Sequence, residues 1–162
     1  MSRHVGAEYF APRPATAADV DVLVRHRVRM FAEMGFTSDD GFAGLAAACR
    51  GWFADALAAG RYLGWLVARA DAPSEIVAGS GLLLHEWPPG IRDLGTTRAY
   101  VLNVYTEPPH RGHGLATQLT RAAVDEARNR GIRVVTLHAS DEGAPIYRRL
   151  GFEETNEMRL LL

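Results

Sequence analysis

Residues 99–116 read AYVLNVYTEPPHRGHGLA and join a strand-like run to a glycine-containing turn. The first part, residues 99–106, is rich in valine and tyrosine, which are typical of a β-strand. Two prolines end that run, and Gly112 and Gly114 follow directly before a segment with helical spacing. This stretch therefore predicts a strand, a tight turn and the start of a helix.

The segment after the turn completes a strand–helix–strand unit. Apolar side chains recur at helical spacing through residues 114–130, and residues 132–139 then read as a second strand. Strands joined by a helix pair in parallel with a right-handed crossover, so the junction between the first strand and the helix is a candidate ligand site. The buried face of the helix is predicted to hold Leu115, Leu119, Ala123 and Ala127.

The two glycines make this junction a candidate site for an anion. Glycine lets backbone N–H groups converge, and the dipole of the following helix favours negative charge there. A bound pyrophosphate and an ordinary tight turn without a ligand both fit the residues. A dinucleotide-binding fingerprint is disfavoured, because its third glycine and its later acidic residue are missing. A P-loop is excluded, because the chain contains no lysine.

The remaining segments predict an α/β chain. Thr16 and Asp19 resemble a capping box at the start of the first helix, and Gly35 ends its periodicity. The expected elements are a proline-interrupted edge strand over 9–15, helices over 16–35 and 39–59, strands over 62–68 and 76–85, and a short helix over 145–150.

Composition bounds the kinds of function open to the chain. It has 162 residues, 18 basic and 19 acidic side chains, and every basic side chain is an arginine. The length suits a single domain over residues 1–162, which can bury about 70% of its unfolded surface. The absence of lysine excludes Schiff-base chemistry. The net charge of −1 gives no general attraction to nucleic acid or to an anionic membrane.

Location and metal binding can also be anticipated from the sequence. Residues 1–18 do not read as a signal peptide, and the apolar runs are too short for a membrane helix, so we expect a cytoplasmic protein. The single cysteine, Cys49, fits a reducing compartment and is expected to be a small buried residue. The six histidines lack the spacing of metal ligands, so no metal is expected.

Two motifs resemble one known family. The run Arg111-Gly112-His113-Gly114-Leu115-Ala116 matches the Arg/Gln-x-x-Gly-x-Gly/Ala signature of the GCN5-related N-acetyltransferases (GNAT), and it follows a strand as it does in that family. Residues 144–152, which end in Leu-Gly-Phe, are similar to the second hallmark of the family. The resemblance implies a mixed, mostly antiparallel sheet flanked by helices, with splayed parallel strands at an acyl-CoA site. It places the coenzyme-binding motifs within residues 99–152.

The resemblance also implies which residues hold acetyl-CoA. Backbone groups of residues 104–106 would pair with the pantetheine arm, and backbone N–H groups of residues 112–116 would hold the pyrophosphate. Many relatives have an asparagine where this chain has Ser140-Asp141, so one of these two would have to substitute for it. His113 occupies the variable position of the signature and is expected to face solvent. The predicted coenzyme-binding residues are Val104, Tyr105, Thr106, Arg111, Gly112, His113, Gly114, Leu115, Ala116, Ser140 and Asp141.

Tyr147 is the predicted catalytic residue. Amide formation from a thioester expels a thiolate, and a nearby phenol can protonate it. In the GNAT family a tyrosine at the matching position often has this role. Without the resemblance, Tyr147 would be read as a core aromatic residue of a short helix.

The sequence does not identify the acetyl acceptor or the general base. Some relatives have a glutamate where this chain has Thr136, which cannot act as a base. Acidic side chains, a histidine and an amide near the expected acceptor groove stay as candidates for proton removal or for orienting the acceptor, and none is singled out. They are Glu33, Asp39, Asp40, Glu86, His138 and Asn103.

These observations predict an N-acetyltransferase that moves an acetyl group from acetyl-CoA to an amine by direct attack. A non-catalytic acyl-CoA-binding or regulatory domain stays open, and a nucleotide-binding module is the more distant alternative. The acceptor class is not fixed, and neither is the oligomeric state, for which a homodimer stays open. Two further groups are read as structural: three arginines as solvated charges and three tryptophans as packed side chains. They are Arg25, Arg27, Arg29, Trp52, Trp65 and Trp87.

Overall fold

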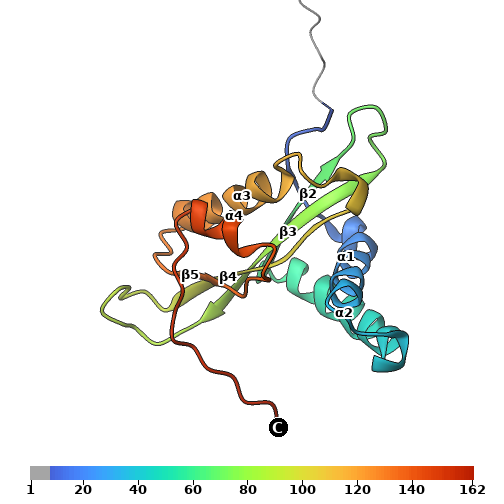
Figure 1. Ribbon diagram of the computed structural model, residues 1–162. Helices are drawn as coiled ribbons and strands as arrows, with labels where there is room; N and C mark the ends of the chain where they lie inside the picture. The colour runs from blue at the N-terminus through green and yellow to red at the C-terminus, as the bar shows by residue number, and fades with distance from the viewer. Residues whose placement is uncertain (1–7) are drawn as a thin grey trace, which may run out of the picture.

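A five-stranded sheet runs through the molecule with helices on both faces (Figure 1). The computed structural model describes residues 8–162, without the side chain of Asp40. The first four strands in the order β1-β2-β3-β4-β5 pair antiparallel, and β5 pairs parallel with β4. This is the mixed, mostly antiparallel α/β fold that the sequence predicts. The strands are β1 (Arg13–Pro14), β2 (Tyr62–Ala68), β3 (Ile76–Glu86), β4 (Thr97–Thr106) and β5 (Val135–Leu137).

Two helices cover each face of the sheet (Figure 1). One face carries α1 (Val20–Glu33) and α2 (Phe42–Ala58), and the other carries α3 (Leu115–Asn129) with the short α4 (Ala144–Arg149) beside it. Three short 3-10 turns precede α1, α2 and α3, at Ala17–Asp19, Ser38–Asp40 and Pro108–His110.

The alternation of side chains along β2 divides the core into two layers. Tyr62 and Leu66 point to the side of α1 and α2, where they pack with Leu23 and Phe53. The neighbouring residue Val67 points to the other side and packs with α3. The predicted face of α3 is confirmed, since its buried side chains include Leu115, Leu119, Ala123 and Ala127. Both layers anchor β4, whose end lies at the candidate site.

A bulge in β4 redirects its last residues. The register slips opposite Gly79 and Gly81 of β3, and Asn103 takes a positive φ of 55°. Asn103 is buried, and its side-chain amide donates to the Leu23 carbonyl oxygen at 3.3 Å. β5 accompanies β4 only from Ala99 to Val101, so the edge of β4 beyond that point has no parallel strand beside it. The splayed strands that the sequence predicts are therefore present.

Several expected boundaries differ from those observed. The strand expected over residues 9–15 is reduced to β1 and one isolated bridge between Tyr9 and Arg69, because its prolines cannot donate ladder hydrogen bonds. The second helix starts later than residue 39, because Gly41 has a φ of +96° directly before it. The strand expected over 132–139 is only three residues long, since it has a single neighbour.

One expectation about side chains is wrong. Trp87 is 52% exposed and does not pack in the core, whereas Trp65 packs against both apolar clusters on the α3 side. Arg25 and Arg29 are exposed, as expected for solvated charges, and both also form ion pairs with Glu107 directly after β4.

Other expectations about individual side chains hold. Cys49 is buried, as expected. Trp52 is 38% exposed and packs edge-on against Phe53 and Tyr62. None of the helices in residues 8–162 has the length and apolar character needed to cross a bilayer.

Candidate active site

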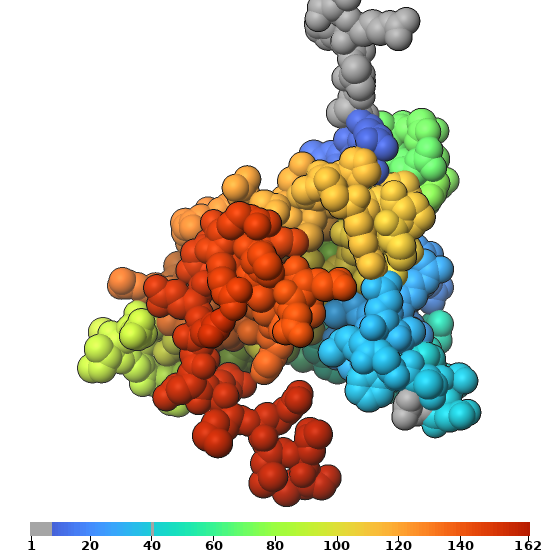
Figure 2. Space-filling model, viewed as in Figure 1, coloured from blue at the N-terminus to red at the C-terminus, as the bar shows by residue number. Residues whose placement is uncertain are grey.

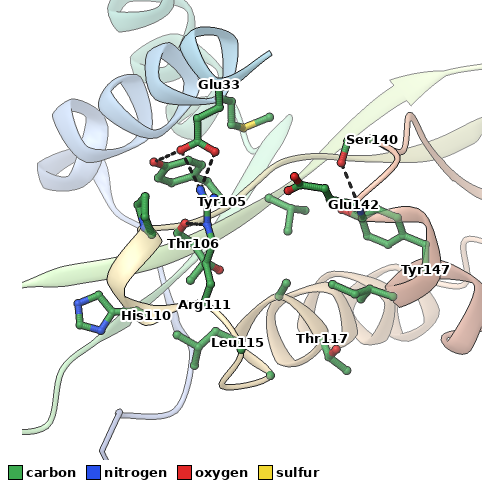
Figure 3. A pocket seen from close by; sticks show the side chains of 18 of the residues that line it. Glu33, Tyr105, Thr106, His110, Arg111, Leu115, Thr117, Ser140, Glu142 and Tyr147 are labelled. Atoms are coloured by element: carbon green, nitrogen blue, oxygen red, sulfur yellow. Dashed lines mark hydrogen bonds and ion pairs between the residues drawn. The ribbon is translucent and has the colours of Figure 1, made fainter. Parts of the chain in front are cut away.

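A cavity of about 1000 Å³ opens where β4 ends. Its walls come from the end of α1, the last residues of β4, the first turn of α3 and the loop that leads into α4 (Figure 3). In the space-filling view it lies in the hollow between the gold, orange-red and blue segments (Figure 2). Its position coincides with the splay between β4 and β5, so backbone groups of β4 are available to a ligand there.

The glycine-containing turn forms one end of this cavity. Gly112 and Gly114 have φ values of +82° and +77°, which residues with a Cβ rarely adopt. The first helical hydrogen bond of α3 runs from the Gln118 N–H to the Gly114 carbonyl at 3.1 Å. The N–H groups of residues 115–117 therefore have no partner within the helix. Together with the helix dipole, they form a site suited to a phosphate group.

Arg111 is held in place by three neighbours. Its Nε donates to the Thr106 carbonyl at 2.9 Å, and its Nη2 contacts both carboxylate oxygens of Glu33 at 2.6 and 2.8 Å (Figure 3). Its guanidinium carbon lies 5.7 Å from the centre of the Tyr105 ring. These contacts tie the glycine turn to β4 and to α1.

Glu33 accepts the hydrogen bonds in the cluster that it forms with Tyr105 and Arg111. It accepts hydrogen bonds from Arg111 and, at 2.9 Å, from the Tyr105 hydroxyl. Burial alone would raise the pKa of Glu33, but the two hydrogen bonds outweigh it and hold that pKa below its ordinary value. Burial and the bond to Glu33 raise the pKa of Tyr105 to about 12. At neutral pH Glu33 is therefore an ionised carboxylate that is already engaged.

Tyr147 lies on the opposite wall, on α4 (Figure 3). Its ring packs edge-on against Phe152, with 6.0 Å between the ring centroids. A Cβ at Gly143 would come within 3.0 Å of the Tyr147 ring, so the glycine leaves room for the phenol. Burial raises the pKa of Tyr147, and the phenol is therefore protonated at neutral pH.

Ser140 shapes the loop that leads into α4. Its hydroxyl accepts a hydrogen bond from the Gly143 N–H at 3.1 Å, and its carbonyl accepts one from the Ala144 N–H at 2.9 Å. Asp141 follows it on the rim and is exposed. Both residues line the cavity, and the roles expected of them stay predictions.

The structure brings almost all predicted site residues to this one cavity. His113 is the exception: its Nδ1 lies 3.1 Å from the His110 carbonyl, its Nε2 lies 3.6 Å from Glu8, and it does not line the wall. The predicted residues that do line the wall are Val104, Tyr105, Thr106, Arg111, Gly112, Gly114, Leu115, Ala116, Ser140, Asp141 and Tyr147.

The structure shows which candidates for the general base lie at this cavity. Glu33 lines this cavity, whereas Asp39 and Glu86 do not. His138 lines a second cavity and contacts the Tyr100 hydroxyl there, and Asn103 is buried against α1. The side chain of Asp40 lies outside the described residues.

Some lining residues carry no sequence signal for this site. Met30 and Met34 reach the cavity from α1, and Glu142 and Arg149 from the region of α4. The cluster of Glu33, Tyr105 and Arg111 joins residues 72 and 78 positions apart, so only the tertiary fold reveals it. Among residues 8–162, no group of three His, Cys, Asp or Glu side chains is placed to hold a metal ion.

Comparison with known proteins finds acetyltransferases both among family profiles and among solved structures. The profile described as "Acetyltransferase (GNAT) family" matches residues 31–152. A solved GCN5-related N-acetyltransferase from Ralstonia eutropha is 35% identical, with a TM-score of 0.86 over 95% of this chain and 98% of that one. A predicted acetyltransferase from Clostridium acetobutylicum, solved with acetyl-CoA, is 28% identical, with a TM-score of 0.84 over 95% and 96% of the two chains.

Curated relatives match over shorter segments. N-alpha-acetyltransferase 30 of Schizosaccharomyces pombe is 37% identical over 62 residues, which are 36% of this chain. An uncharacterized N-acetyltransferase of Methanocaldococcus jannaschii is 41% identical over 59 residues, which are 35% of this chain. The chain spans only 41% and 26% of the length of these two relatives.

Proposed function

The chain belongs to the acetyltransferase (GNAT) family, and we propose that it transfers an acetyl group from acetyl-CoA to the nitrogen of an amine. One observation carries this proposal. A single cavity joins the open edge of β4, the first turn of α3 and the Tyr147 phenol. These are the three features that a thioester donor with a pyrophosphate needs: a partner for its amides, a site for its phosphates and a proton donor for its sulfur.

The donor would lie along β4 and end at α3. The outer edge of β4 at residues 104–106 would pair with the pantetheine amides, because β5 does not extend that far, and the Thr106 carbonyl there already accepts a hydrogen bond from Arg111. The N–H groups of residues 112–116 would hold the pyrophosphate, with the helix dipole adding to the attraction. The Clostridium acetobutylicum neighbour, which covers nearly the whole chain and was solved with acetyl-CoA, supports this donor.

The proposed transfer is a direct attack. The neutral amine nitrogen attacks the thioester carbonyl carbon, the carbon–sulfur bond breaks, and the new amide bond forms as the nitrogen loses a proton to solvent water. Tyr147 donates its phenolic proton to the leaving thiolate and regains a proton from solvent. Because the pKa of Tyr147 is raised, the donor is present in its protonated form at neutral pH.

Glu33 is assigned a positioning role in this scheme. Its carboxylate oxygens are occupied by Arg111 and Tyr105, so proton removal from the amine would break an ion pair. By holding Arg111, Glu33 instead fixes the turn that would bind the pyrophosphate. It is therefore not assigned as the general base.

The test is release of free coenzyme A in the presence of amines. The purified chain is mixed with acetyl-CoA and a panel of small amines, peptide N-termini and lysine peptides, and new thiol is measured with a thiol-reactive dye. The chain suits this assay, because it has no lysine to acetylate and its only thiol, Cys49, is buried. We expect release with at least one acceptor class and an acetylated acceptor by mass spectrometry.

Two outcomes would contradict the proposal. Binding of acetyl-CoA without transfer to any acceptor class would favour a non-catalytic acyl-CoA-binding domain. No binding of coenzyme A, measured by calorimetry beside ATP and NAD, would remove the basis of the assignment.

A further inference from the structure

The turn before α3 is attached to α1 at both of its ends. Glu107 begins this turn directly after β4, and Arg111 ends it directly before the two glycines. Arg111 is paired with Glu33 through its Nη2 (Figure 3). Glu107 is paired with Arg29, which lies one helical turn before Glu33 on α1. The first pair lies in the wall of the acetyl-CoA cavity, whereas Arg29 and Glu107 do not line it.

The two ion pairs have matching spacing on both partners. Arg29 and Glu33 are four residues apart on α1, so their side chains lie on one face of the helix. Glu107 and Arg111 are also four residues apart, and each ion pair joins positions 78 residues apart in the chain. Because the order of charges is reversed between the helix and the turn, each guanidinium meets a carboxylate. We call these four side chains the α1 clamp.

Hydrogen bonds of the backbone connect the two ends of the turn. The Glu107 N–H donates to the Val77 carbonyl of β3 at 2.8 Å, which keeps the start of the turn on the sheet. The His110 N–H donates to the Glu107 carbonyl at 2.9 Å, and the Arg111 N–H donates to the Pro108 carbonyl at 3.3 Å. A displacement of Glu107 is therefore transmitted to Arg111 and to the glycines that follow it.

Glu107 places a carboxylate close to a turn that would bind an anion. Its side chain is only 13% exposed, and the Arg25 Nε lies 3.7 Å from one of its oxygens as a second cation beside Arg29. The His26 Nε2 lies 3.9 Å from the same oxygen, but burial lowers the pKa of His26 to about 3. His26 is therefore uncharged at neutral pH, and the two arginines supply the positive charge that pairs with Glu107.

We propose that Arg29 and Glu107 are positioning residues, which through the α1 clamp hold the glycine turn where its N–H groups can bind the pyrophosphate of acetyl-CoA. This inference rests on the proposed function, because it requires the donor to bind at the turn. Neither side chain lines the cavity, so both act on the donor only through the turn. Since ion pairs with exposed partners contribute little to the free energy of unfolding, the effect belongs mainly to coenzyme binding.

Two charge-removing variants, Arg29→Gln and Glu107→Gln, separate positioning from simple attraction. By charge alone, loss of the arginine should weaken the binding of an anionic coenzyme, and loss of the glutamate should strengthen it. The clamp predicts instead that both variants raise the dissociation constant of coenzyme A, by about 3- to 10-fold. Calorimetric titration at about 0.15 M salt measures this constant. Circular dichroism checks that each variant is folded.

The double variant tests whether the two side chains act as a pair. If they act through one contact, the double variant should bind coenzyme A about as weakly as either single variant. Arg50→Gln is the matched control. Its Nε lies 3.1 Å from the Asp21 carboxylate, so this ion pair joins α1 to α2 and not to the turn. The control should keep the native dissociation constant.

A truncated donor tests whether the effect concerns the pyrophosphate. S-acetylpantetheine has the thioester and both amides of acetyl-CoA but no pyrophosphate. With acetyl-CoA, the two single variants should show a raised KM and an unchanged kcat. With S-acetylpantetheine, their kcat/KM should stay within about twofold of the native value. A general loss of structure would lower kcat/KM with both donors.

Amide exchange tests the clamp without any donor. The N–H groups of His110, Arg111 and Gln118 are hydrogen-bonded within the turn and the first turn of α3. Their exchange should be faster in both single variants than in the native chain. The Gly131 N–H, which donates to the Arg128 carbonyl at the other end of α3, should exchange at the native rate.

Three results would overturn the proposal. They are tighter binding of coenzyme A by Glu107→Gln, a loss in the double variant equal to the product of the two single losses, and native amide exchange at Arg111 in both single variants. Each is measured against a native chain that binds coenzyme A. A native chain that does not bind coenzyme A would refute the proposed function itself, so the two failures are distinct.

Discussion

At the scale of single residues, Tyr147 carries the most specific chemical claim. Replacing it with phenylalanine removes the proton donor and leaves the ring that packs against Phe152. We therefore expect kcat to fall by about 10²-fold or more, while the dissociation constant of coenzyme A stays unchanged. Steady-state kinetics and calorimetry on the same preparation measure the two quantities.

Tyr100→Phe is the matched control for that experiment. Its hydroxyl contacts His138 beside the second cavity and does not line the first. Its removal should leave kcat within a few-fold of the native value. Equal losses in both variants, or none in Tyr147→Phe, would refute the role assigned to Tyr147.

The residues of the site differ in whether a short stretch of sequence is enough to identify them. Gly112 and Gly114 could be selected from the sequence, because a tight turn before a helix is a local pattern. The bond between Glu33 and Arg111 could not, because it joins α1 to the turn before α3, 78 positions apart. The sequence therefore indicated where a phosphate would bind. It did not indicate that Arg111 is already paired with the Glu33 carboxylate.

At the scale of elements, the start of α3 makes a second prediction. Gly114→Ala introduces a Cβ at a φ of +77°, which costs about 1 kcal/mol, and shifts the backbone N–H groups that would hold the pyrophosphate. We expect the dissociation constant of coenzyme A to rise about tenfold, a loss of about 1.4 kcal/mol of binding free energy. Calorimetric titration measures it.

Gly131 provides the control at the other end of the same helix. Its φ of +75° makes Gly131→Ala equally strained, but it lies away from the cavity. The thermal midpoint should fall by a similar amount in both variants, and only Gly114→Ala should lose affinity. Parallel losses of affinity would mean that the effect is general destabilisation.

The start of α1 makes a third prediction. Asp19 accepts two hydrogen bonds from Arg13, both at 2.9 Å, and one from the Thr16 N–H at 2.8 Å. Asp19→Asn should lower the free energy of unfolding by about 1–2 kcal/mol at neutral pH. Asp21→Asn, at an exposed position in the first turn of the helix, should cost less. Urea unfolding measures both.

This third effect should depend on pH. The bond to Arg13, more than that to Thr16, holds the pKa of Asp19 below its ordinary value. A carboxyl with a lowered folded pKa stabilises the protein above its unfolded pKa, about 4, and loses that contribution as the pH falls through the folded value. The difference between native and Asp19→Asn should therefore shrink in acid, and a constant difference would contradict this account.

The lengths of the elements show what local sequence can and cannot specify. The α3 helix follows from its periodicity, because it buries a regular apolar face. The β2 and β3 strands follow from their short apolar runs bounded by turn residues, because helices cover both faces of the sheet there. β5 does not reach its expected length, since pairing depends on neighbours that the sequence of that segment does not contain.

At the scale of the whole molecule, the free energy of unfolding depends on close packing between the sheet and the layer that contains α2. A Cβ at Gly81 would overlap the phenol of Tyr62, which is fully buried in the core. Gly81→Ala should therefore destabilise the fold by about 2 kcal/mol or more. Gly51→Ala, in α2 with open space around it, should stabilise the fold by about 0.5–1 kcal/mol. Opposite shifts of the thermal midpoint are expected, and a Gly81→Ala protein of native stability would contradict the packing described.

The overall architecture was predictable because two local motifs resemble a known family, and the fold follows from that resemblance. Residues 152–162 carry an apolar run in the sequence but form neither helix nor strand in the structure, and only the tertiary arrangement shows this.

The central claim is that acetyl-CoA binds between β4, the first turn of α3 and Tyr147. The most direct measurement is a crystal structure of the chain with acetyl-CoA bound. We expect the pyrophosphate within hydrogen-bond distance of the N–H groups of residues 112–116, and the thioester sulfur facing the Tyr147 hydroxyl. Acetyl-CoA bound outside this cavity, or with its thioester directed away from Tyr147, would contradict the account.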